Sequence, residues 1–197
     1  WLWMIIPWVP VALIGTAEAF LVGFKNNQAY DRLWEARKIW GGIVNSSRSF
    51  AAMVYAFETD NNEVGAFDLE DRRKKIVYRH IAWLYAFRDQ LLVPTEWEHI
   101  KAEEKKSHHI DQKRNRLIKA GFPDYGRTPI FINKYLSEEE AELQSQYKNF
   151  ATYLISQQAK DVNELKNLKT ISDFNQKQLQ DCLNEFYTLQ GQAERIK

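Results

Sequence analysis

The sequence predicts an all-α protein in which a membrane helix continues into a cytosolic helical bundle. Three observations carry this prediction. Apolar residues recur at three- and four-residue spacing through most of the 197-residue chain, as they do on helices with one buried face. No segment alternates apolar and polar residues over the length of a strand. Charged residues make up 27% of the chain, yet Glu18 is the only ionisable side chain among the first 24 residues.

The N-terminal apolar segment, residues 1–24, is long enough to cross a membrane once. As a helix it would reach about 36 Å, against about 30 Å for the hydrocarbon core of a bilayer. Pro7 and Pro10 are tolerated best at or before a first helical turn, so regular helix is expected from about Val11. The alternative is a secretory signal peptide cleaved near residues 17–19, but no initiating Met and no basic segment precede it.

The helical pattern continues beyond this apolar segment. It runs without a breaker to Gly41-Gly42, and an apolar face then continues to about Glu58. Residues 60–71 contain turn-forming residues and are expected to be a connection. An amphipathic helix follows from about Arg72 to Pro94, and its charged residues, Arg79 among them, are expected on a solvated face. Residues 25–197 are expected to form one cytosolic helical domain.

Two capping boxes predict further helices in the second half of the chain. In this motif a hydroxyl and a carboxylate three residues apart satisfy the free amides of a helix start. Thr95 with Glu98 predicts a helix that runs to about residue 120, before a Gly- and Pro-rich loop. Ser137 with Glu140 predicts a helix that runs to about residue 159. A last helix is expected from about Ser172 to near the end of the chain.

The composition argues against nucleic-acid binding and against disulfides. The net charge is +1, with basic and acidic residues interleaved, so the chain has no global positive field. Cys182 is the only cysteine, which excludes an intrachain disulfide, and it is expected to be a small core residue.

The motifs that resemble metal sites are incomplete. Glu96-x-x-His99, with Glu103 one turn later, has the spacing of one half of a two-metal site, but no second Glu-x-x-His is present. His108-His109-x-Asp111 lies in a run of Lys, Glu and Gln, where a solvated surface is the ordinary interpretation. No metal and no cofactor are therefore predicted.

The sequence offers no anchor for catalysis. None of the nucleotide-binding, hydrolase or zinc-protease motifs is present. Ser107 does precede His108, but neighbouring residues on a helix diverge, so the pair is poorly placed to act as nucleophile and base. The chain is predicted not to be an enzyme.

Several stretches resemble the bacterial bestrophin family. The longest, at residues 24–41, reads FKNNQAYDRLWEARKIWG and is similar to the family's sequence after its second transmembrane helix. The others, in chain order, are VNSSRSF at 44–50, IAWLYAFR at 81–88, LNE at 183–185 and QGQAERIK at 190–197. The resemblance covers nearly the whole chain. It implies a homopentamer around one axial pore, in a multi-pass protein of the bacterial inner membrane of which this chain is a piece truncated at both ends.

Three residues match the family's pore neck. Thr16, Phe20 and Phe24 are spaced by four, which places them on one helix face, and five copies would form three stacked rings. Apolar rings of this kind gate by dewetting. Thr16 stands where the family usually has a bulky apolar residue, so a wider or wetter first ring is expected. The alternative is that the two phenylalanines only pack against neighbouring helices. Glu18 lies about 200° around the helix from Thr16 and is expected to face a partner helix or the interface rather than the neck axis.

The resemblance also implies a cytosolic aperture near the start of the final helix. Counting back from residues 183–185 places it at Lys177, or at Gln176 if the register slips by one. Five ammonium groups there would attract anions, whereas the ordinary alternative is an exposed lysine on an amphipathic helix.

The function that follows is passive conduction of small monovalent ions through a membrane channel, with a weak preference for anions such as chloride. The alternative from another class is a membrane-anchored helical scaffold without a pore. The stoichiometry of the assembly separates the two.

Overall fold

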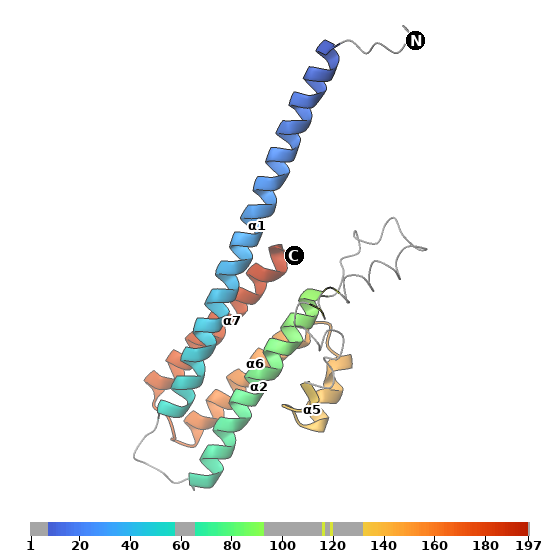
Figure 1. Cartoon of the computed structure of the whole chain (residues 1–197). Coiled ribbons are helices and arrows are strands. Elements are labelled where there is room, and N and C mark those ends of the chain that lie inside the picture. The colour runs from blue at the N-terminus through green and yellow to red at the C-terminus, as the bar shows by residue number, and fades with distance from the viewer. Residues whose placement is uncertain (1–7, 58–65, 93–115, 117–118, 120–131, 197) are drawn as a thin grey trace.

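The computed structural model describes residues 8–57, 66–92, 116, 119 and 132–196 (Figure 1). These residues form the helices α1 (Trp8–Ala56), α2 (Ala66–Leu92), α5 (Glu138–Glu142), α6 (Phe150–Asn167) and α7 (Asp173–Ile196), with a 3₁₀ turn, η3 (Leu143–Ser145), after α5. The described residues include no strand, and the predicted all-α class is confirmed.

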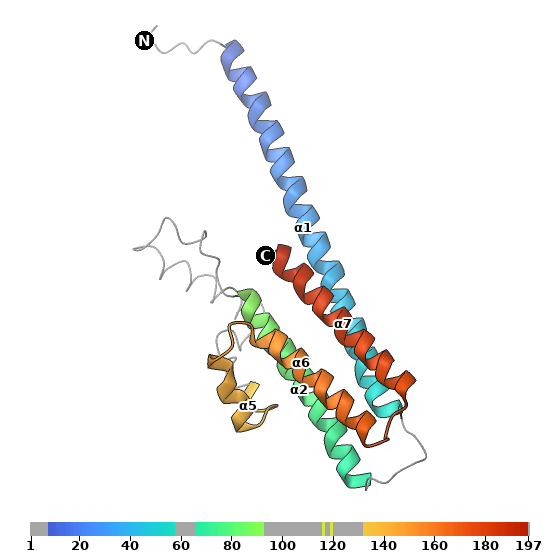
Figure 2. The ribbon, with the colours of Figure 1, turned by 180° about the vertical axis from the view of Figure 1, so that it is seen from behind.

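The C-terminal part of α1, below in Figure 1, forms a four-helix bundle with α2, α6 and α7. Helix α1 packs mainly on α7, α2 packs mainly on α6, and α6 joins α7. Figures 1 and 2 show these neighbours running antiparallel, with the N-terminal half of α1 extending far beyond the other helices. The chain thus consists of a compact bundle and one protruding rod.

Helix α1 is a single helix of 49 residues, about 74 Å long at 1.5 Å per residue. The helix runs through Gly41-Gly42 without interruption. Gly42 has a packing role, because a Cβ atom there would lie 3.0 Å from the Cδ2 atom of Leu189 on α7. The missing side chain lets α7 approach α1 closely.

The bundle core is aromatic at its centre. Phe50 from α1, Trp83 and Phe87 from α2 and Phe186 from α7 are all fully buried. Trp83 stacks on Phe87 with ring centroids 5.7 Å apart, and Phe50 meets Phe186 edge to face at 5.8 Å. Burying each of these side chains stabilises the fold by about 1.5–3 kcal/mol. This contact between helices distant in sequence therefore contributes to the stability of the bundle together with the rest of the apolar core.

Helix α2 begins earlier than predicted. It starts at Ala66, inside the segment expected to be a connection. Leu69 is buried two turns before Ile76 on the same face of α2. Asp68, in the first turn, pairs with Arg72 at 3.0 Å. Core packing and a favourable charge at the helix start outweigh the turn-forming residues nearby.

The helix predicted from residue 137 to residue 159 is in fact divided. The cap itself is confirmed, since the Ser137 hydroxyl accepts a hydrogen bond from the Glu140 amide at 3.3 Å. Helix α5 is short, however, and α6 has its own cap at Asn149, whose side-chain oxygen accepts from the Thr152 amide at 2.9 Å. Asparagine is a favoured N-cap because its side-chain oxygen satisfies a free amide of the first helical turn.

Helix α6 runs to Asn167, beyond the predicted end, and stops in a Schellman motif. The Thr170 amide donates to the Leu165 carbonyl at 3.1 Å and the Lys169 amide to the Lys166 carbonyl at 2.8 Å. Lys169 adopts φ 56°, a left-handed conformation that is usually left to glycine.

The predicted start of the last helix is confirmed. The Ser172 hydroxyl accepts a hydrogen bond from the Asn175 amide at 3.1 Å, directly before α7. The predicted capping box at Thr95 and Glu98, and the Gly- and Pro-rich loop at 121–129, lie outside the described residues.

Candidate functional site

The three predicted neck residues share one exposed face of α1. Phe20 and Phe24 lie one turn apart, with ring centroids 6.4 Å apart and ring planes inclined by 26°. Their side chains are 64% and 63% exposed. Thr16 lies one turn before Phe20, and all three line the same open groove along the helix. The helix therefore carries a continuous face that is largely apolar.

The whole upper part of α1 lacks partners within the described chain. Every residue from Trp8 to Trp34 is exposed, and the first buried residue of the helix is Ile39. Of the described helices, α1 alone is long and apolar enough to cross a membrane. Its exposed apolar surface is what lipid or further protein would cover.

Thr16 carries a hydrogen bond that the sequence did not predict. Its hydroxyl donates to the carbonyl oxygen of Ala12, one turn earlier, at 2.9 Å. Glu18 is exposed on another side of the helix, and none of the described residues forms an ion pair or hydrogen bond with it.

The lower part of α1 is held by α7. Besides the contact of Gly42 with Leu189, the Arg195 guanidinium near the end of α7 donates to a Glu35 carboxylate oxygen at 3.2 Å. Ile39 and Ile43, on the same stretch of α1, are buried. The bundle therefore fixes the direction in which the exposed part of α1 points.

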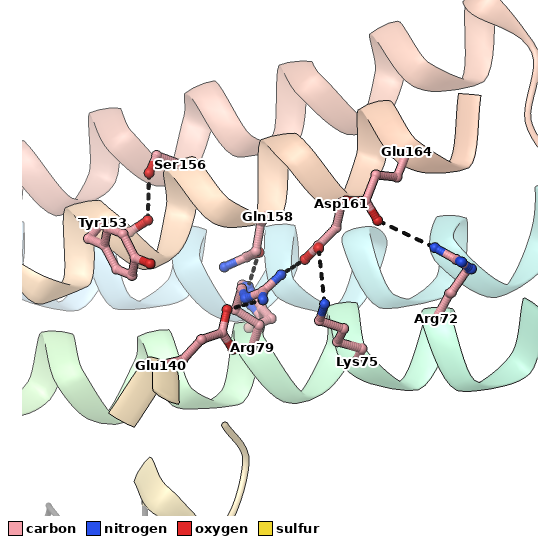
Figure 3. Close-up of polar contacts among 10 residues, drawn as sticks. Arg72, Lys75, Arg79, Glu140, Tyr153, Ser156, Gln158, Asp161 and Glu164 are labelled. Carbon is pink, nitrogen blue, oxygen red and sulfur yellow. Dashed lines mark hydrogen bonds and ion pairs between the residues drawn. The ribbon is translucent and has the colours of Figure 1, made fainter. Parts of the chain in front are cut away.

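Arg79 ties α2 to two other helices. Its guanidinium forms ion pairs with Glu140 of α5 and Asp161 of α6 (Figure 3). Arg79 is only 3% exposed, so the prediction that it lies on a solvated face is wrong. Lys75 approaches the same Asp161 carboxylate at 4.0 Å, and Arg72 reaches Glu164 at 3.4 Å nearer the helix start. Two acidic side chains compensate the burial of one cation.

His80 is a buried histidine at the meeting point of the bundle helices. One ring nitrogen, Nε2, lies 2.9 Å from the Ser47 hydroxyl, and the other, Nδ1, lies 3.4 Å from the Gln158 amide oxygen. Burial lowers the pKa of His80 to about 4, against its ordinary value of 6.5. The imidazole is therefore neutral at pH 7 and packs among Phe50 and Phe186.

A second buried polar network joins α2, α6 and α7. The Gln190 amide oxygen accepts from the Trp83 indole at 3.1 Å, and the Gln190 amide nitrogen donates to Thr152 at 3.0 Å and to Glu194 at 2.9 Å. Gln90 of α2 donates to the same Glu194 carboxylate at 2.9 Å. These bonds fix the rotation of α7 relative to the other helices.

The two candidate aperture residues lie in the first turns of α7 and differ in their surroundings. The Gln176 side-chain amide donates to the Asn163 side-chain oxygen of α6 at 3.3 Å. Lys177 is exposed, and its ammonium pairs with no other described residue. Cys182, further along α7, is partly buried against the core, and burial raises the pKa of its thiol.

Some sequence predictions fall outside the structure, and some structural residues were missed. Glu96, His99 and Glu103 lie outside the described residues, as do Ser107 and the group His108, His109 and Asp111. His80 was missed, although its spacing from Ile76, Trp83 and Phe87 places it on the buried face of α2 and could have identified it.

Solved structures share this fold. A mutated bacterial bestrophin homolog from Klebsiella pneumoniae superposes with a TM-score of 0.72 at 17% identity, over 98% of this chain and 57% of that chain. A second structure, described as a membrane protein, gives a TM-score of 0.70 at 18% identity with the same coverage of both chains. At these identities the likeness shows the fold alone.

Sequence comparisons add the family. The sequence model described as bacterial/fungal bestrophin protein, Bestrophin_2, matches residues 1–197.

Curated relatives match over shorter stretches. A voltage-dependent anion channel-forming protein of Ralstonia nicotianae is 58% identical over 40 residues, which are 20% of this chain and 13% of that protein. A protein of the same description from Nostoc is 34% identical over 83 residues, which are 42% of this chain and 24% of that protein. Another, from Escherichia coli K12, is 37% identical over 71 residues, which are 36% of this chain and 22% of that protein. The matched stretches thus span 24% or less of each of these relatives.

Proposed function

This chain belongs to the family of bacterial and fungal bestrophin proteins and is a membrane protein, and we propose that it is one subunit of a homopentameric channel for small monovalent ions. The proposed channel prefers anions such as chloride, and conduction is passive. The anion preference follows the relatives, which are described as anion channel-forming proteins.

One observation carries the proposal. The face of α1 with Thr16, Phe20 and Phe24 stands clear of the bundle, although two of its three side chains are large and apolar. Soluble monomeric proteins rarely expose a contiguous apolar face of this kind. Arranged around an axis, five copies of this face would form an apolar constriction that lets ions pass only when it is hydrated.

A row of small residues beside the neck face supports the packing of several α1 helices. Gly15, Ala19 and Gly23 follow the same four-residue spacing, rotated by about 100° from the neck residues. Apart from adjacent residues and the nearby backbone of α1 itself, no described atom lies within 4 Å of where a Cβ would stand at Gly15 or Gly23. Small residues let neighbouring helices approach closely in a membrane. In the proposed pentamer this row lies against the next subunit.

Lys177 supports the anion preference at the cytosolic side. Its exposed ammonium, free of partners within the described chain, would be repeated around the axis five times near the start of α7. A ring of positive charges raises the local concentration of anions and repels cations. Gln176, which is bonded to Asn163, is the weaker candidate for this aperture.

Two measurements on the full-length protein test the proposal. Native mass spectrometry in detergent is expected to give five copies, and a monomer or dimer would favour a membrane-anchored scaffold instead. Reconstituted in planar bilayers under a chloride salt gradient, the protein is expected to conduct with a reversal potential displaced toward that of chloride. The absence of any current above empty bilayers would overturn the proposal.

A further inference from the structure

The Thr16 hydroxyl is committed to the backbone of its own helix. A hydroxyl has one hydrogen to donate, and that of Thr16 is donated to the Ala12 carbonyl oxygen at 2.9 Å. The same carbonyl also accepts the Thr16 backbone amide as part of the regular helix. The hydroxyl thus uses the second lone pair of a carbonyl that is already bonded, a common arrangement for threonine in membrane helices.

This bond decides which chemistry Thr16 offers to its surroundings. An anion in a pore needs donors, and the hydroxyl has none left. Only the oxygen lone pairs, which an anion avoids, and the methyl group remain. The Thr16 side chain is exposed, and it is followed one and two turns later by the rings of Phe20 and Phe24.

We propose that Thr16 acts in the neck as an apolar residue, whose methyl group sets the width of the first ring while its hydroxyl makes no contact with the permeating ion. This inference rests on the proposed function, because it requires α1 to line the pore. It replaces the expectation that a polar Thr16 makes the first ring wetter. Thr16 then controls how fast ions pass, and the choice between ions is made elsewhere.

Two substitutions separate the methyl group from the hydroxyl. Thr16→Val keeps the shape and removes the hydroxyl, and the Ala12 carbonyl stays bonded to the helix amide. Thr16→Ser keeps the hydroxyl, which can still bond to Ala12, and removes the methyl group. Phe20→Ala, in the next ring, reports whether α1 lines the pore at all.

The experiment is single-channel recording of the full-length protein and the three variants in planar bilayers, with the reversal potential taken under a salt gradient. We expect Thr16→Val to keep both the conductance and the reversal potential. We expect Thr16→Ser and Phe20→Ala to raise the conductance several-fold, Thr16→Ser without any shift in reversal potential.

The outcomes distinguish the inference from the function on which it rests. If Phe20→Ala raises the conductance but Thr16→Val shifts the reversal potential, the hydroxyl contacts the ion and the inference is wrong while the neck stands. The inference also fails if Thr16→Ser leaves the conductance of such a channel unchanged. If Phe20→Ala and Thr16→Ser are both without effect, the neck assignment fails and the inference falls with it.

Discussion

Phe20 and Phe24 stack on each other along the exposed face of α1, with ring centroids 6.4 Å apart. Aromatic pairs in stacked contact contribute about 0.5–1.5 kcal/mol beyond the area they bury. The two side chains therefore form one continuous apolar wall along about one helical turn before any neighbouring subunit is considered. A wall that is ordered within a single helix suits a constriction whose width must be reproducible.

Arg79→Leu is expected to destabilise the bundle strongly. The substitution leaves Asp161, which is 7% exposed, without its main cation, and breaking a buried pair in this way costs about 3 kcal/mol or more. The measurement is denaturant unfolding of the purified protein, followed by circular dichroism. Arg72→Leu is the control, because its pairs with Asp68 and Glu164 are exposed and contribute less than about 1 kcal/mol. Equal losses in the two variants would contradict the anchoring role of Arg79.

His80 is expected to make the stability depend on pH. Its pKa is about 4 in the folded protein and near 6.5 when unfolded, so the unfolded state binds the proton more readily. The stability due to a neutral His80 is complete above pH 6.5 and falls by about 3 kcal/mol as the pH drops to 4. Unfolding free energies measured from pH 7.5 to 4 should show this loss. A His80→Gln variant should show a flatter profile over the same range, and an identical slope would exclude His80 as the cause.

Lys169→Gly is expected to stabilise the protein. The residue has φ 56° at the end of α6, where glycine avoids the steric cost of a side chain, and a gain of about 1 kcal/mol is expected. Lys166→Gly, inside the last turn of α6, should instead lose about 1 kcal/mol, because glycine weakens a helix interior. Thermal unfolding of both variants tests the pair, and a loss of stability at residue 169 would contradict the Schellman assignment.

Lys177→Glu is expected to weaken the preference for anions. Reversing the charge in every subunit would place a ring of carboxylates where the proposed aperture has ammonium groups. The reversal potential under a salt gradient should shift toward that of the cation. Lys160→Glu, which reverses an exposed lysine on α6, should leave it unchanged. Equal shifts in the two variants would show that general surface charge acts, and that Lys177 is not at the aperture.

Local signals in the sequence predicted the helices well where the cause was local. The cap at Ser137 and the helix start near Ser172 depend on residues within one turn, and both were predicted. The break before α6 was missed because the cap at Asn149 depends on a turn whose formation is decided by packing. The role of Gly42 was missed because Leu189, which it contacts, lies on another helix.

The buried ion pairs that hold the bundle together were harder to predict than the exposed face of α1. The spacing of Thr16, Phe20 and Phe24 already indicated a shared helix face, because the helical period fixes it. Arg79 carries the same charge as its solvated neighbours, and its partner Glu140 lies 61 positions away in the sequence. Its spacing from Ile76 and Trp83 places Arg79 on the buried face of α2, but the carboxylates that compensate its charge come from other helices, and no local pattern places them beside it.

The most direct test of the channel assignment is the single-channel conductance of Phe20→Ala beside that of Val22→Ala. Phe20 lies on the proposed pore face, whereas Val22, also exposed on α1, points about 200° away from it. The account predicts a several-fold higher conductance or a constant leak for Phe20→Ala and unchanged currents for Val22→Ala. Unchanged currents in Phe20→Ala, from a variant that still assembles, would contradict the assignment of this face to the pore.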